Sequence, residues 1–140
     1  MLVDTGLELL DEDECRRLLG VRSVGRIGVS VQSLPAIFPV NYRLVGDRIL
    51  FRTAVGTKFD AAVAGAVVGF EVDWFDSFGH EGWSVLVVGR ASIVPPEEDL
   101  DPTLVRPWAD GDRHHLVAIA IELISGRRIR HDMPVHDVRG

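Results

Sequence analysis

Cysteine is almost absent from this chain, whose 140 residues contain one, Cys15. A single cysteine excludes an internal disulfide and a zinc site built from several cysteines. Cys15 precedes Leu18 and Leu19 at helical spacing, so we predict a buried structural thiol rather than a nucleophile.

An excess of positive charge is also missing. The chain has 15 Lys and Arg against 21 Asp and Glu, a net charge of -6 and a pI near 5.3. A protein that binds nucleic acid needs a basic face, so this balance argues against nucleic acid as a partner. No apolar run is long enough to span a bilayer and no signal peptide is visible, so we predict no membrane partner and a cytoplasmic location.

The common catalytic and metal-binding motifs are missing as well. There is no Walker loop, no G-x-G-x-x-G, no H-E-x-x-H and no serine framed by glycines. The five histidines lack the spacing of a metal site, and His114 and His115 are adjacent, so they would point apart on a regular element. We therefore predict no metal site and assign no catalytic residue.

The chain contains enough apolar residues, 46%, for one globular domain. We place this domain at residues 1–130 and a polar tail at residues 131–140. A first helix should be capped by Asp11 and end at Gly20, and a second should run from Thr57 to Ala64 before Gly65. Short strands with few helices predict a small mostly β barrel. The six predicted strands are Val24–Val31, Ile37–Leu44, Arg48–Ala54, Ala66–Trp74, Trp83–Ile93 and Leu116–Leu123.

The segment Phe51-Arg52-Thr53-Ala54-Val55-Gly56-Thr57-Lys58 is the most informative motif. It predicts a strand end, a glycine turn and a helix start that Thr57 caps. The unpaired N–H groups of a helix start attract anions, and Arg52 and Lys58 add positive charge beside them. A phosphate site is one interpretation, and two solvated cations at an ordinary corner are the other.

Two further groups of residues have a structural and a functional interpretation. Pro39 lies inside Phe38-Pro39-Val40-Asn41-Tyr42 and cannot donate to a strand ladder, which predicts an edge, a bulge or a contact with another group. Asn41 could present its amide to a heterocycle. The three tryptophans could form a wall for a flat ring or simply close the barrel ends. They are Trp74, Trp83 and Trp108.

In order along the chain, these motifs resemble the pyridoxamine 5′-phosphate oxidase-like flavin-binding split-barrel superfamily, and most closely its small flavin-nucleotide-binding members. The resemblance covers about residues 8 to 130. It is carried by the following segments: Val24–Val29, Phe38–Tyr42, Phe51–Lys58, Gly82–Val85, Gly89–Ala91 and Arg106–Trp108.

The resemblance implies a six-stranded antiparallel split β-barrel with short flanking helices, which forms a homodimer with two flavin sites at the subunit interface. It implies that Phe38, Pro39, Val40 and Asn41 line the flavin ring. Arg52, Thr53, Thr57 and Lys58 would hold the phosphate of FMN, while Trp83 and Trp108 would approach the site.

The resemblance also implies an FMN-dependent oxidoreductase with an unknown small-molecule substrate. Because the carboxy-terminal arginine and histidine motif of the true oxidases is missing, oxidation of vitamin B6 is not expected. Three alternatives remain open: a deazaflavin-dependent reductase, a non-catalytic flavin carrier or sensor, and a haem-binding module. Haem would need an axial ligand from His80, His114 or His115.

Overall fold

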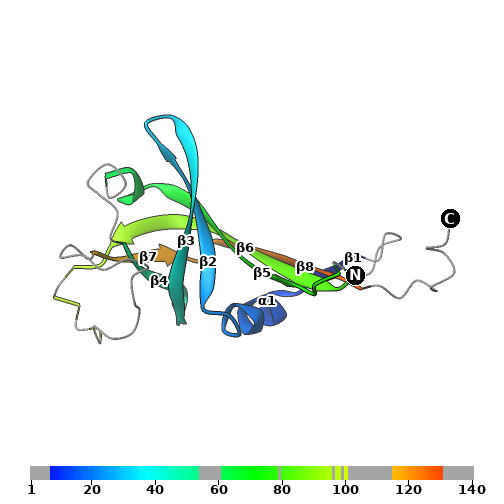
Figure 1. Cartoon of the computed structure of the whole chain (residues 1–140). Helices are drawn as coiled ribbons and strands as arrows, with labels where there is room; N and C mark the ends of the chain where they lie inside the picture. The colour runs from blue at the N-terminus through cyan, green and yellow to red at the C-terminus, as the bar shows by residue number, and fades with distance from the viewer. Residues whose placement is uncertain are drawn as a thin grey trace, which may run out of the picture.

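The computed structural model describes residues 7–53, 61–78, 80–95, 97–98, 100 and 115–130. Within these ranges the protein is mostly β, with short helices (Figure 1). A second helical segment covers residues 61–63. No helix in the described ranges is long and apolar enough to cross a bilayer. The labelled elements are β1 (Leu7–Leu10), α1 (Glu12–Leu19), β2 (Val24–Val31), β3 (Leu34–Val45), β4 (Arg48–Thr53), β5 (Val67–Phe75), β6 (Gly82–Ile93), β7 (His115–Ala120) and β8 (Leu123–Ile129).

Six of the strands form a closed antiparallel barrel. Their hydrogen-bonded order is β6, β5, β2, β3, β4 and β7, and β7 pairs with β6 again to close the ring. The predicted six-stranded antiparallel split barrel is therefore confirmed. β8 and β1 continue the sheet from β6, and with β5 they form the long arm that leaves the barrel in Figure 1.

The prediction of one last strand over Leu116–Leu123 is wrong, because the strand is interrupted within this range. β7 ends at Ala120 and β8 begins at Leu123, and both pair with the same edge of β6. The break lies beside Gly89, where a methyl group would stand 1.7 Å from the carbonyl oxygen of Ala120. The apolar pattern continues across the break, so sequence periodicity did not reveal it. β8 and the unpredicted β1 raise the number of described strands to eight.

The hairpin between β2 and β3 has a shorter turn than predicted. Gln32 and Ser33 both have positive φ, 51° and 68°, as the tight turns that match strand twist require. β3 therefore begins at Leu34, which the prediction had placed in the connection with Pro35. This hairpin projects from the barrel at the top of Figure 1.

Helix α1 forms where the sequence predicts a helix, and it packs against β8 and β6. The Asp11 side chain accepts a hydrogen bond from the Glu14 N–H at 2.8 Å, which caps the first turn. Cys15 is fully buried, and burial raises the pKa of its thiol. The Tyr42 hydroxyl donates to the Leu19 carbonyl at 2.5 Å and so ties β3 to the end of the helix. The predicted buried thiol is confirmed.

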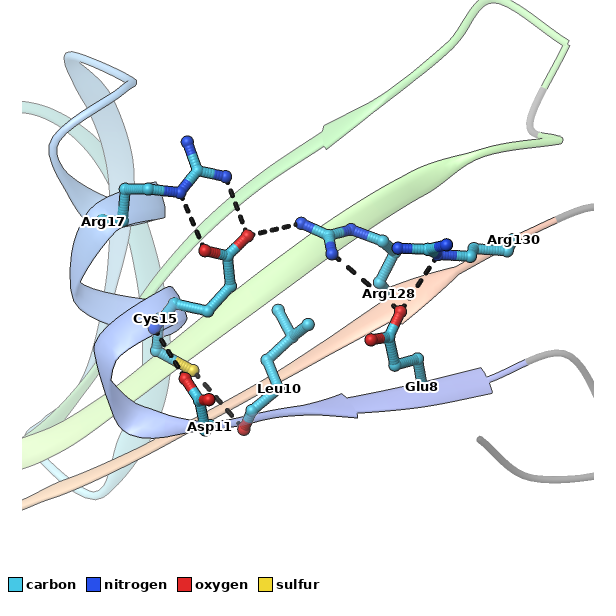
Figure 2. A network of polar contacts seen from close by, with 8 residues as sticks. Glu8, Leu10, Asp11, Cys15, Arg17, Arg128 and Arg130 are labelled. Atoms are coloured by element: carbon cyan, nitrogen blue, oxygen red, sulfur yellow. Dashed lines mark hydrogen bonds and ion pairs between the residues drawn. The ribbon is translucent and has the colours of Figure 1, made fainter. Parts of the chain in front are cut away.

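A chain of ion pairs joins α1 to the arm (Figure 2). Arg17 donates two hydrogen bonds of 2.8 Å to the Glu14 carboxylate. Arg128 of β8 donates a third to the same carboxylate, also at 2.8 Å. Glu8 of β1 then pairs with Arg128 at 3.9 Å and with Arg130 at 3.0 Å. Elements from the two ends of the described chain are thus held together through two carboxylates.

The network predicts a pH-dependent contribution to stability from Glu14. Hydrogen bonds from Arg17 and then Arg128 lower the pKa of Glu14 from 4.5 to about 2. A lowered folded-state pKa gives stabilisation that is complete above the unfolded value and is lost as the pH falls toward about 2. In thermal melts, Glu14→Gln should therefore lower Tm clearly at pH 6, and the difference from the unmodified protein should shrink between about pH 4.5 and 2. Glu97→Gln, at an exposed position, is the control, and a Tm difference for Glu14→Gln that does not change with pH would contradict the prediction.

Candidate functional site

The segment predicted to line a ring lies in β3 where one edge of the strand is open. Residues 34–41 pair with β2, whereas β4 first pairs with β3 at Tyr42. Within the described ranges, no strand neighbours the other edge of residues 34–41. We call this edge the open edge of β3. Pro39 lies in it, which agrees with the first of the three alternatives that the sequence left for this proline, an edge.

The register of β3 and β4 brings the two predicted site segments together. Tyr42 and Phe51 form the last pair between the two strands, and Asn41 and Arg52 are the next residues beyond it on β3 and β4. Tyr42 and Phe51 point into the core. Because side chains alternate along a strand, Asn41 and Arg52 belong to the outer face of the barrel. An amide and a guanidinium thus share one face at the start of the open edge.

On its other side, β4 places a histidine beside the predicted phosphate motif. Thr53 pairs with His115, the first residue of β7, and Arg52 pairs with Leu116. The sequence prediction had considered His115 only as a haem ligand. Its position next to Thr53 depends on a pairing between strands that are far apart in the sequence, so no local signal could have revealed it.

Three predicted site residues, Thr57, Lys58 and Trp108, lie outside the described residues. The backbone of the motif is described only as far as Thr53. The assignment of Thr57 and Lys58 to a phosphate site, and of Trp108 to the ring site, stays a prediction.

Trp83 lies on another part of the sheet. It is nearly buried, pairs with Trp74 on β5 and with Arg128 on β8, and lines a cavity of about 280 Å³ with both residues. Phe38 is in register with Ile27 on β2, and Ile27 is in register, through Phe70 on β5, with Val87 on β6. Trp83 lies four residues further along β6 than Val87, a separation of about 13 Å along the strand. One subunit therefore does not bring Trp83 beside Phe38.

A larger cleft of about 580 Å³ opens between β2 and β5. The two strands pair only from Arg26 to Gly28 and then diverge. The chain before and at the start of β2 forms one wall, and the end of β5 forms the other. We call this cavity the β2–β5 cleft. Its lining includes Val21, Arg22, Val24, Asp73, Trp74 and Phe75.

An ion-pair cluster lies beside this cleft. Arg26 contacts Glu71 at 3.1 Å and Asp73 at 3.3 Å. Burial and the neighbouring Asp73 raise the pKa of Glu71, although Arg26 acts in the opposite direction. Glu71 and Asp73 are two residues apart on β5, so their side chains lie on one face of the strand. The structure shows that both share one arginine.

The described residues contain no group of three or more His, Cys, Asp or Glu side chains that could hold a metal ion. His80, the other described histidine, stacks on Phe78 with ring centroids 5.8 Å apart. Its backbone N–H donates to Asp76 at 2.9 Å. His80 therefore takes part in a local turn on the arm.

The split barrel, which carries the open edge of β3 and the β2–β5 cleft, defines the class of protein. The family model for pyridoxamine 5′-phosphate oxidase matches residues 11–128. The chain belongs to this family, the pyridoxamine 5′-phosphate oxidase-like flavin-binding split barrels. The family predicted from the sequence motifs is thus confirmed.

Relatives of known sequence and structure agree with this membership. The uncharacterized protein Rv0080 of Mycobacterium tuberculosis is 39% identical over 127 residues, which cover 86% of this chain and 84% of that protein. A FAD-binding protein from Mycobacterium smegmatis is 35% identical, with a TM-score of 0.69 and coverage of 89% and 99%. A FAD-binding protein from Mesorhizobium loti is 25% identical, with a TM-score of 0.70 and coverage of 87% and 96%.

Proposed function

We propose that this protein binds a flavin nucleotide at the open edge of β3. The observation that carries the proposal is the end of the β3–β4 pairing at Tyr42 and Phe51, which leaves Asn41 and Arg52 as the next residues where this edge begins. An open strand edge carries backbone donors and acceptors, which suit the polar rim of a flavin ring. Phe38, Pro39, Val40 and Asn41 provide that edge, as the sequence analysis predicted.

We assign the flavin phosphate to the end of β4. Arg52 lies there, and the predicted motif continues through Thr53 to Thr57 and Lys58. A guanidinium can donate two parallel hydrogen bonds to phosphate, and a helix start adds backbone donors. The ribityl chain of the flavin would span the distance between the ring at the open edge and the phosphate at the end of β4.

The flavin could be FMN, predicted from the sequence, or FAD. Two relatives that are 25% and 35% identical are described as FAD-binding proteins, which favours FAD. A deazaflavin coenzyme has a similar ring and phosphate and is the third candidate. A protein described as binding FAD and haem is only 15% identical and supports the fold alone.

We further propose that the protein is a homodimer. Leu34 and Ile37 on the β2–β3 hairpin are 70% and 73% exposed, a high value for large apolar side chains. A second copy of the chain would cover them and the neighbouring open edge. The second copy would also bring residues that one subunit keeps away from the ring, such as Trp83, close to it.

The proposed activity is oxidoreduction of a small molecule. A bound flavin supplies the hydride chemistry, and the protein supplies its position and electrostatic surroundings. Asn41 would orient the ring through its amide, and Arg52 would neutralise the phosphate. Reduction of the flavin-loaded protein by NADH or NADPH, followed by turnover of an acceptor, would separate an enzyme from a flavin carrier.

The flavin proposal is tested by titrating the apoprotein with FMN, FAD and the deazaflavin while recording flavin fluorescence. We expect saturation at one flavin per chain and a dimer in sedimentation experiments. Arg52→Ala and Lys58→Ala should each weaken binding by about 10- to 100-fold, because each removes a charge-assisted contact worth about 1.5–3 kcal/mol.

Arg127→Ala is the matched control, since Arg127 is an exposed arginine on β8, away from the open edge. Its Kd should equal that of the unmodified protein. Unchanged flavin affinity in both the Arg52 and Lys58 variants would disprove the phosphate assignment. A protein that binds none of the three cofactors would disprove the function.

A further inference from the structure

The β2–β5 cleft has the size of a small-molecule site. Its volume of about 580 Å³ lies within the range of pockets that hold ligands, about 300–1,000 Å³. The cleft exists because β2 and β5 share only three residue pairs before they diverge. The strand register therefore opens the gap that the cleft occupies.

Large apolar side chains are left exposed around this cleft. Trp74 and Phe75 on β5 are 40% and 44% exposed, and Val21 and Val24 on the opposite wall are 57% and 43% exposed. Aromatic faces favour flat partners, and the valines can cover the other side of such a partner. The apolar part of the lining therefore suits a planar molecule.

One arginine of the cleft lies outside its ion pairs and can bind an anion. Arg26 is shared by two carboxylates, those of Glu71 and Asp73, at 3.1 and 3.3 Å. Arg22, by contrast, pairs with no carboxylate in the part of the chain that the structure describes. One guanidinium at the rim is thus available for a carboxylate, sulfonate or phosphate group.

The cleft also adjoins the proposed ring site. Val24 in the cleft wall pairs with Asn41 of the open edge. The carbonyl oxygen of Ser23 accepts a hydrogen bond from the Tyr42 N–H at 3.0 Å. Paired residues on adjacent strands lie about 5 Å apart, so the cleft and the ring edge are separated by about one strand spacing.

We propose that the β2–β5 cleft binds a planar organic anion, of the aromatic carboxylate class, in addition to the flavin. Trp74 contacts its plane and Arg22 binds its charged group. The role of this site as the substrate subsite rests on the proposed flavin function, but the binding itself does not.

The test compares two probes, 4-nitrobenzoate and 4-nitrobenzamide, which have nearly the same shape and differ in charge. Isothermal titration of the full-length protein without flavin should show the carboxylate binding about tenfold more tightly than the amide, as one charge-assisted contact predicts. Arg22→Gln should abolish this preference and leave amide binding unchanged. Trp74→Ala should weaken the binding of both probes.

Arg127→Gln makes the same charge change outside the cleft and should keep the tenfold preference. Circular dichroism of each variant checks that it is folded. Equal affinity for the two probes in the unmodified protein, or an unchanged preference in Arg22→Gln, would overturn the proposal.

The same titration on flavin-saturated protein distinguishes the cleft from the cofactor site. 4-Nitrobenzoate should bind without releasing the flavin, and competition between the two would show that the cleft belongs to the cofactor and would overturn a separate site. If no flavin binds, the proposed function fails, whereas the titrations without flavin still decide whether the cleft binds the anion.

Discussion

Gly89→Ala should unfold or strongly destabilise this protein. Gly89 lies where β6 passes from its pairing with β8 to its pairing with β7. An added methyl carbon would lie 1.7 Å from the carbonyl oxygen and 2.8 Å from the carbonyl carbon of Ala120. These are backbone atoms, so no side-chain rotation can relieve the clash. We expect a loss of about 3 kcal/mol or more in the free energy of unfolding, measured by urea denaturation.

Gly28→Ala is the control because it adds the same methyl group within β2. The nearest atom to that methyl group would be the Gly69 carbonyl oxygen, at 3.9 Å. Gly28 lacks a positive φ, so alanine fits its backbone, and we expect an effect between zero and a stabilisation of about 1 kcal/mol. All variants should be compared at one protein concentration, because a dimer gains stability with concentration. Similar unfolding free energies for both variants would contradict the close crossing at Gly89.

Phe70→Ala should cost about 3–5 kcal/mol of unfolding free energy, as is usual when a buried aromatic side chain is removed. Phe70 is fully buried on β5. Its ring occupies the space above Gly25, where a methyl group would lie 2.4 Å from the ring. It also packs edge to face with Tyr42, with ring centroids 4.9 Å apart. Its loss therefore leaves a cavity between three strands of the barrel and removes an aromatic pair.

Phe78→Ala removes the same side chain from the loop on the arm, where it is 79% exposed. Its effect should stay within about 0.5 kcal/mol. Urea denaturation of both variants gives the comparison. A loss below about 1 kcal/mol for Phe70→Ala would show that the core closes over the gap, in conflict with the packing described here.

Helix α1 and most strands could be predicted because their signals are local. Asp11, Glu14 and Gly20 mark the helix within a few residues, and the apolar alternation in β2 gives its bounds, Val24–Val31, without error. β1 could not be predicted because its four residues form a strand only by pairing with β8. The break between β7 and β8 depends likewise on contact with Gly89, which is distant in sequence.

The candidate site likewise has features that the sequence could predict and features that it could not. Pro39 and Arg52 stood out in the sequence because proline is rare within strands and a cation before a glycine turn suits a phosphate. The sequence could not show that the pairing of β3 with β4 ends next to Asn41 and Arg52, that His115 lies beside Thr53, or that β2 and β5 diverge. Those facts depend on strand register.

The sequence by itself therefore determined the mostly β composition, the capped helix and the family, and it predicted residues that a flavin would need. Tertiary structure alone decided how the barrel closes, where the edge of β3 stays open and which side chains surround the β2–β5 cleft. The physical reason is the range of the interactions. Caps, turns and alternation act between residues a few positions apart, whereas strand pairing and core packing join residues from distant parts of the chain and are settled only when the whole sheet forms.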